Sequence, residues 1–181
     1  MEEGIQVMTQ LTPCGGPLPE LEVPMITTLV RCLGSEHRKL DGLNVQLAFS
    51  ATALAADPEA VASGQRLFEV WDEIRRDLWS HLQIEDGLVF GWGGAHHAIS
   101  GTLLNALKVE HEEMRKSVAA LPTLYSGVNG NPQTERDRAA FARTLLAFSR
   151  TFDSHVERYE REVLPSILRA VFHKQGPPTI Q

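Results

Sequence analysis

The sequence is poor in several features that mark particular classes of protein. It has only two cysteines, Cys14 and Cys32, among 181 residues. Two are too few for a disulfide framework, so we expect a reducing, cytoplasmic location. No apolar run reaches the length of a membrane span, and the first residues, MEEGIQ, are acidic and lack an apolar segment. We therefore expect neither secretion nor a membrane-spanning helix.

Basic residues are fewer than acidic residues. Seventeen lysines and arginines stand against 23 aspartates and glutamates, which gives a formal net charge of −6, and the pI is near 5.6. A nucleic-acid-binding domain or a surface for anionic lipid needs a basic patch, so neither partner is expected. The chain is 43% hydrophobic, which suffices for one sizeable core and predicts one folded domain.

Apolar residues recur at steps of three and four residues in four long segments, as they do on one face of an amphipathic helix. Four long helices with short connections predict an all-α, up-down-up-down four-helix bundle. The expected helices cover residues 24–55, a second segment that starts at Asp57-Pro58 and carries its apolar face to Leu88, residues 97–121, and a fourth segment from Thr134 to about His173.

Glycine and proline set the expected boundaries of these helices. Gly91, Gly93 and Gly94 are expected to break the chain before the third helix, and Pro122 to end that helix before a loop over 123–133. The domain prediction is an N-terminal Pro/Gly-rich arm, the bundle itself and a short C-terminal tail, at residues 1–22, 23–174 and 175–181.

One histidine lies on the buried face of each expected helix, at His37, His81, His111 and His155. The first and second are 44 residues apart, as are the third and fourth, and the two pairs are offset by 74 residues. This is an internal two-fold repeat. Glu85 follows His81 by one helical turn, so both side chains share a face, and a buried imidazole and carboxylate need a compensating cation. A single histidine on an apolar face is more often a core residue, but the repeated spacing favours a metal site.

This pattern resembles the hemerythrin-like family, also called the HHE cation-binding domain, over roughly residues 25–170. The family's motif order is matched by His37, by His81 with Glu85, by His111, and by His155, with Pro165 ten residues on. The resemblance implies a four-helix bundle that holds two irons through histidines and bridging carboxylates. It also implies that the four histidines and Glu85 are metal ligands.

The fourth motif departs from the family. Tyr159 stands one turn after His155, where a carboxylate is expected, and Glu160 follows it. Some members carry a carboxylate five residues after the last histidine, which would make Glu160 the bridge. On a regular helix Tyr159 stays near the His155 face while Glu160 turns away, unless Pro165 or a bulge distorts the helix. Both residues are therefore candidates at the metal site. Arg115 stands where members that bind oxygen reversibly have another histidine.

The resemblance implies a non-haem diiron protein that binds or reacts with a small ligand, namely oxygen, nitric oxide or peroxide. Two alternatives stay open, which are a metal-dependent regulatory or iron-storage module without catalysis, and a metal-free bundle that binds a partner. Asp41, one turn after His37, is expected either to accept a hydrogen bond from an imidazole or to be solvated.

Overall fold

A computed structural model describes residues 23–56, 61–129 and 135–175. The expected arm, the expected starts of the second and fourth helices at Asp57-Pro58 and Thr134, and residues 176–181 lie outside the described residues. The elements in chain order are α1 (Val23–Ala56), α2 (Val61–Ile84), η2 (Glu85–Phe90), α3 (Gly91–Ala95), α4 (Gly101–Asn129), α5 (Glu135–Arg158), η3 (Tyr159–Val163) and α6 (Leu164–Gln175), where η2 and η3 are π-helical segments.

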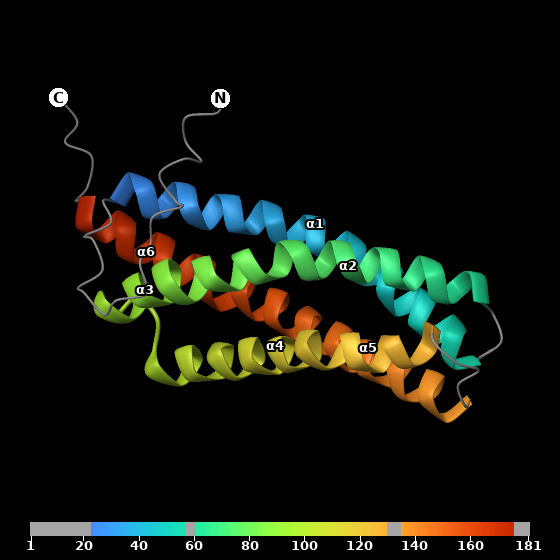
Figure 1. Cartoon of the computed structure of the whole chain (residues 1–181). Coiled ribbons are helices and arrows are strands. Elements are labelled where there is room, and N and C mark those ends of the chain that lie inside the picture. The colour runs from blue at the N-terminus through green and yellow to red at the C-terminus, as the bar shows by residue number, and fades with distance from the viewer. Residues whose placement is uncertain (1–22, 57–60, 130–134, 176–181) are drawn as a thin grey trace.

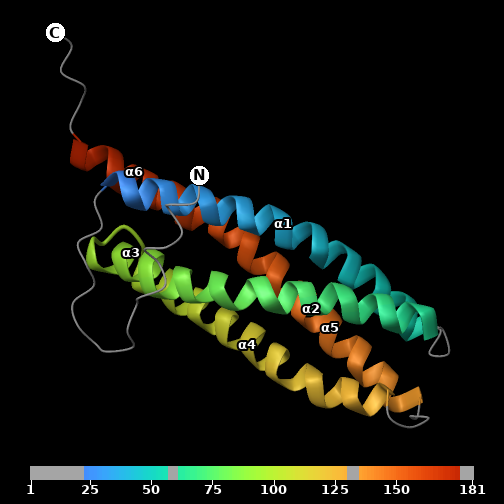
Figure 2. The ribbon, with the colours of Figure 1, turned by 45° about the horizontal axis from the view of Figure 1, so that its top comes forward.

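These elements form four antiparallel rods. The segments α2, η2 and α3 follow one another without a break, as do α5, η3 and α6, while α1 and α4 are single helices. Helix α1 packs against α2 and α5, and α4 packs against α5. The start of α1 and the end of α6 lie side by side at one end of the bundle (Figures 1 and 2). The predicted all-α four-helix bundle is confirmed, and no helix among the described residues is long and apolar enough to cross a membrane.

The glycine-rich segment does not break the second rod where the sequence predicted a break. Helix α3 continues through Gly91, Gly93 and Gly94, and the chain turns only at His96 and His97, where His97 has a φ of 53°. An added Cβ at position 93 would lie 2.4 Å from Ile99 Cδ1 and 2.7 Å from Ile99 Cγ1, so any larger residue there would require the buried Ile99 side chain to shift. The glycines therefore permit a close approach of the returning chain rather than ending the helix.

The third rod is longer than expected. Helix α4 runs to Asn129 and includes Pro122, which was predicted to end it. Proline removes one backbone hydrogen bond of a helix and disfavours the preceding turn. Helix α4 nevertheless continues through Pro122 for seven more residues. Much of the predicted loop over 123–133 is therefore helical.

The buried apolar residues form two separate clusters along the bundle. One cluster includes Leu40, Leu78, Met114 and Phe152. The other, at the end where α1 begins, includes Leu33, Leu88, Leu107 and Tyr159. Each of the four helical rods contributes to both clusters. In α1, α4 and the α5 rod one repeated histidine lies between the two contributions, and in the second rod His81 lies next to Leu82, the last residue that this rod gives to the first cluster. The buried histidines thus form a polar layer where the two clusters meet.

The two π-helical segments repeat the two-fold relation in the backbone. Segment η2 begins at Glu85 and η3 begins at Tyr159, which are 74 residues apart, like the histidines that precede them. In η3 the N–H of Leu164 donates to the carbonyl of Tyr159, five residues earlier. Such widened turns are rare in proteins overall, but those that occur often lie at functional sites. Their paired positions place both directly beside the polar layer.

Candidate metal centre

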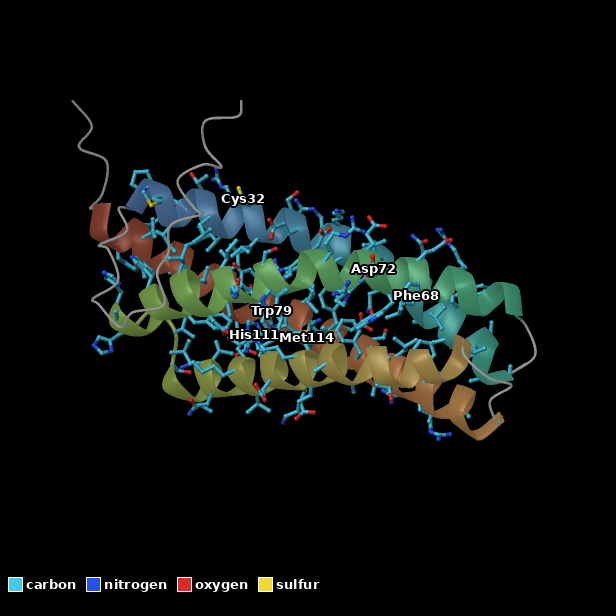
Figure 3. All side chains as sticks on the ribbon, in the orientation of Figure 1. Cys32, Phe68, Asp72, Trp79, His111 and Met114 are labelled. Carbon is cyan, nitrogen blue, oxygen red and sulfur yellow. The ribbon has the colours of Figure 1, made fainter. Side chains whose placement is uncertain are left out.

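The four repeated histidines meet in the polar layer around one carboxylate. His37, His81, His111 and His155 are each at most 1% exposed, and Glu85 is fully buried. Figure 3 shows His111 near the middle of the bundle's length, with Met114 further along the same helix. The ring centroids of neighbouring histidines lie 4.5 to 5.4 Å apart, so the four rings share one level of the bundle. The structure thus brings together five of the seven residues that the sequence singled out.

The Nε2 atoms of all four histidines face Glu85. The distances to its nearer carboxylate oxygen are 3.6 Å for His37, 3.5 Å for His81, 3.1 Å for His111 and 3.2 Å for His155. The Nε2 atoms of His37 and His81 are 2.8 Å apart. One ligand atom from each of His37, His81, Glu85 and His155 can be chosen so that all lie within 4.8 Å of one another. This is the separation expected of side chains that share a metal.

Several polar atoms of this layer have no hydrogen-bond partner among the described residues. They include both Glu85 oxygens and the Nε2 atoms of His111 and His155. A buried polar atom without a partner is costly, and a buried carboxylate is more so. Imidazole nitrogens and a carboxylate are good ligands for iron and zinc. The donor set therefore fits a cation, which would satisfy all of these atoms together.

Three carboxylates at the edge of the layer face the opposite nitrogens of the histidines. Glu36 Oε2 lies 2.9 Å from His81 Nδ1, and Asp86 Oδ1 lies 2.9 Å from His111 Nδ1. A carboxylate can only accept, so each Nδ1 carries the proton and each neutral ring presents a lone pair at Nε2. Such pairs fix both the tautomer and the orientation of a ligating histidine.

The third pair lies within the second half of the repeat and joins Glu110 to His155. Glu110 Oε2 faces His155 Nδ1 at 3.5 Å, and Glu110 Oε1 accepts a hydrogen bond from Arg158 at 3.0 Å. No role for these outer carboxylates was predicted from the sequence. A signal was present, because Glu36 and Glu110 each stand directly before a repeated histidine and are themselves 74 residues apart.

The pKa values of the buried groups in the layer are shifted in different directions. Burial lowers the pKa of His37 to about 3, although Glu85 lies close. Burial acts against the charged form of His155 as well, but Glu85 and Glu110 outweigh it and raise the pKa of His155 to about 9. Burial also opposes the charge of Glu85, yet the imidazoles of His155 and His111 hold the pKa of Glu85 well below its usual range. Without a cation the layer therefore holds a carboxylate and an imidazolium.

Tyr159 lies inside the bundle at the rim of this layer. Its side chain is fully buried, its ring stands edge-on to His37 with centroids 4.6 Å apart, and its hydroxyl has no hydrogen-bond partner. Burial and the charge of Glu85 raise the pKa of Tyr159 above its usual value. The hydroxyl is therefore a neutral donor without an acceptor.

Glu160 and Asp41 lie outside the layer. Both are exposed and line a surface pocket that His37 also lines. The π-helical turn begins at Tyr159, so it leaves Tyr159 one regular turn after His155 and does not turn Glu160 inward. Asp41 forms no hydrogen bond with His37, whose Nδ1 has no partner.

A profile of the hemerythrin HHE cation binding domain matches residues 28–167, which is most of the chain and includes the whole polar layer. The chain belongs to this family. No curated protein and no solved structure matches it.

This hemerythrin HHE domain carries an arginine near its third histidine. Arg115, one turn after His111, forms an ion pair with Asp86, the carboxylate that also accepts from His111 Nδ1. Both side chains are partly buried. Arg115 therefore does not face the layer but holds the carboxylate that orients one of its histidines.

Proposed function

We propose that the polar layer holds a pair of irons through His37, His81, His111, His155 and Glu85. The observation that carries the proposal is the convergence of four Nε2 atoms on a fully buried carboxylate whose oxygens form no well-aligned hydrogen bond with a described residue. Iron bound there would supply a redox-active centre that coordinates a small ligand, namely oxygen, nitric oxide or peroxide. A reducing, cytoplasmic setting is part of this proposal and accords with Cys32 being exposed and free.

The protein's own residues would orient and isolate this centre. Glu36 and Asp86 hold the protons of His81 and His111 at Nδ1, so that each Nε2 presents its lone pair inward. The apolar clusters on both sides of the layer exclude water along the bundle axis.

We expect protein purified from iron-rich cells to contain close to two irons per chain, measured by metal analysis against protein concentration. His81→Ala and His111→Ala should each lower this content sharply, because each removes a neutral donor whose orientation is already fixed. His173→Ala is the matched control, since His173 is exposed and lies far along α6. Full iron content in both inward variants would place the metal elsewhere or exclude it.

Tyr159 is proposed to act on the bound ligand or on the metal itself. Its hydroxyl is buried, unpaired and beside His37. If it donates a hydrogen bond, Tyr159→Phe should keep the iron content and change the rate of reaction with peroxide or oxygen by about tenfold. If it is a direct ligand, the ferric protein should show a visible charge-transfer band that Tyr159→Phe abolishes.

Glu160→Gln separates these roles from the alternative in which Glu160 bridges the metal. Because Glu160 is exposed and outside the layer, this variant should keep both iron content and colour. Loss of iron in Glu160→Gln would favour the bridging role. A Tyr159→Phe protein that matches the parent in colour, iron content and reactivity would reduce Tyr159 to a core aromatic.

A further inference from the structure

Two arginine ion pairs that join different rods lie at the edge of the polar layer. Arg115 of α4 pairs with Asp86 of η2, and Arg158 of α5 pairs with Glu110 of α4 at 3.0 Å. Every other arginine ion pair among the described residues stays within one rod. Ion pairs on the surface of a single helix need only residues three or four positions apart. These two pairs instead connect neighbouring rods at the level of the histidines.

The Asp86 carboxylate is shared between an arginine and a histidine. Its Oδ1 lies 2.9 Å from His111 Nδ1, and its Oδ2 pairs with the Arg115 guanidinium. Asp86 and Arg115 are 30% and 27% exposed, whereas His111 is fully buried. Water screens the ion pair only in part. The guanidinium therefore reduces the negative charge that Asp86 presents to the imidazole.

The Glu110 carboxylate is shared in the same way. Its Oε1 accepts a hydrogen bond from Arg158, and its Oε2 faces His155 Nδ1 at 3.5 Å without a well-aligned hydrogen bond. Glu36, which has no arginine partner among the described residues, lies closer to its own imidazole, with 2.9 Å between Glu36 Oε2 and His81 Nδ1. Arg158 thus holds Glu110 where its interaction with His155 is weaker.

The other side of the polar layer lacks such arginines. No described lysine or arginine forms a salt bridge with Glu36, the carboxylate behind His81. His37 Nδ1 has no hydrogen-bond partner among the described residues. The two arginines therefore act on His111 and His155 alone, and the two sides of the layer differ in the charge behind their imidazoles.

This difference matters for a metal that changes its oxidation state. A carboxylate that accepts the proton of Nδ1 makes the imidazole a stronger donor at Nε2. A stronger donor favours ferric over ferrous iron, because the higher charge gains more from the donated electron density. An arginine that shares the carboxylate weakens this effect and so favours ferrous iron.

We propose that Arg115 and Arg158 are positioning residues that raise the reduction potential of iron bound at the His111 and His155 side of the polar layer. They act through the two carboxylates, which they hold beside the imidazoles and partly neutralise. The inference rests on the proposed function, since it needs iron in the layer. It adds that the two sides of the layer are unequal and that the side with the arginines is reduced first.

The test is an anaerobic redox titration of the full-length, iron-loaded protein, followed by visible absorbance after the iron content has been measured. Arg115→Gln should raise the preference for ferric over ferrous iron about tenfold, which lowers the midpoint potential of the first one-electron reduction by about 59 mV. Arg158→Gln should lower it as well. Arg161→Gln is the matched control and should keep the parent's potential, because Arg161 is 76% exposed and pairs with Glu157 on its own rod.

A double-mutant cycle separates action through Asp86 from a direct effect of the arginine's charge. Asp86→Asn alone should raise the potential, because His111 keeps a hydrogen-bond acceptor that is no longer negative. In the Asp86→Asn background, Arg115→Gln should no longer lower the potential. Arg115→Lys, which keeps the positive charge, should stay closer to the parent than Arg115→Gln does. An equal drop with and without the Asp86 carboxylate would overturn the proposal.

Iron content and melting temperature distinguish the possible failures, and circular dichroism checks the fold of every variant. A parent without iron would overturn the proposed function and this inference with it. A parent with its iron, together with unchanged potentials in Arg115→Gln and Arg158→Gln, would overturn this inference alone. A lower melting temperature with an unchanged potential would reduce the two arginines to ties between rods and would overturn it as well.

Discussion

Replacing Glu85 with glutamine is expected to leave the protein folded and almost without iron. Glu85 is the carboxylate that all four inward Nε2 atoms face, at 3.1 to 3.6 Å. Glutamine keeps the volume but removes the negative charge that offsets a buried cation. A buried cation that loses its charged ligand is strongly destabilised, so we expect iron affinity to fall by more than about a hundredfold.

The measurement is iron content after gel filtration in the presence of a weak chelator. Glu69→Gln is the matched control, because Glu69 is an exposed glutamate on the same rod, 53% exposed and paired only with Arg66. It should keep the parent's iron content. A Glu85→Gln protein that retains its iron would show that the metal does not lie among these histidines.

The second large effect is expected on removal of iron. Without a cation the layer holds both Glu85 oxygens and two inward Nε2 atoms without hydrogen-bond partners. Ligand linkage gives roughly 4 kcal/mol of stability when free metal exceeds its dissociation constant about a thousandfold. For a chain of this size, we expect stripping to lower the melting temperature by about 10 °C. Differential scanning calorimetry of loaded and stripped protein measures this difference.

The difference should depend on pH in a defined direction. In the stripped protein the pKa of His155 is raised to about 9, so His155 must lose a proton before it can ligate. Iron affinity should therefore fall by about tenfold for each pH unit below that pKa. The melting temperatures of the loaded and stripped forms should converge on acidification. A constant difference across this range would contradict the assignment of His155 as a ligand.

The stripped protein itself should be most stable near pH 6.5. The raised pKa of His155 gives stability that is complete below its unfolded value of 6.5 and is lost as pH rises through about 9. His37 acts on the other side, because its pKa is lowered to about 3 in the folded state. The unfolded chain then binds the extra proton, so stability falls as pH drops from 6.5 toward 3.

The equal separations of the histidines made the fold and the layer predictable. Helical spacing placed one histidine on the buried face of each rod, and the repeat placed them at one level. The outer carboxylates needed knowledge of which helices are neighbours, because Glu36 and Asp86 reach across to histidines on another rod. Spacing along one helix does not show which helices are neighbours. The repeated Glu-His pairs at 36–37 and 110–111 did indicate that these glutamates belong to the same repeat as the histidines.

The helix boundaries were less predictable because packing outweighed local preference. Gly93 was interpreted as a breaker, but a helix continues through it, and any larger residue there would require the buried Ile99 side chain to shift. Pro122 was expected to end a helix that continues to Asn129. The π-helical turns at Glu85 and Tyr159 leave no local signature in composition. Only the backbone of the structure shows that the two turns are a pair, because they are separated by 74 residues, as the histidines are.

The polar layer between two apolar clusters also limits how far each helix can slide along its neighbours. If α1 moved by one turn, Leu33 or Leu40 would come level with Glu85, and His37 would be buried among aliphatic side chains with no partner. An apolar face that repeats every three or four residues would tolerate several such alignments. A single buried polar position fixes alignment in coiled coils at some cost in stability. Here four buried histidines and one buried glutamate fix the alignment together.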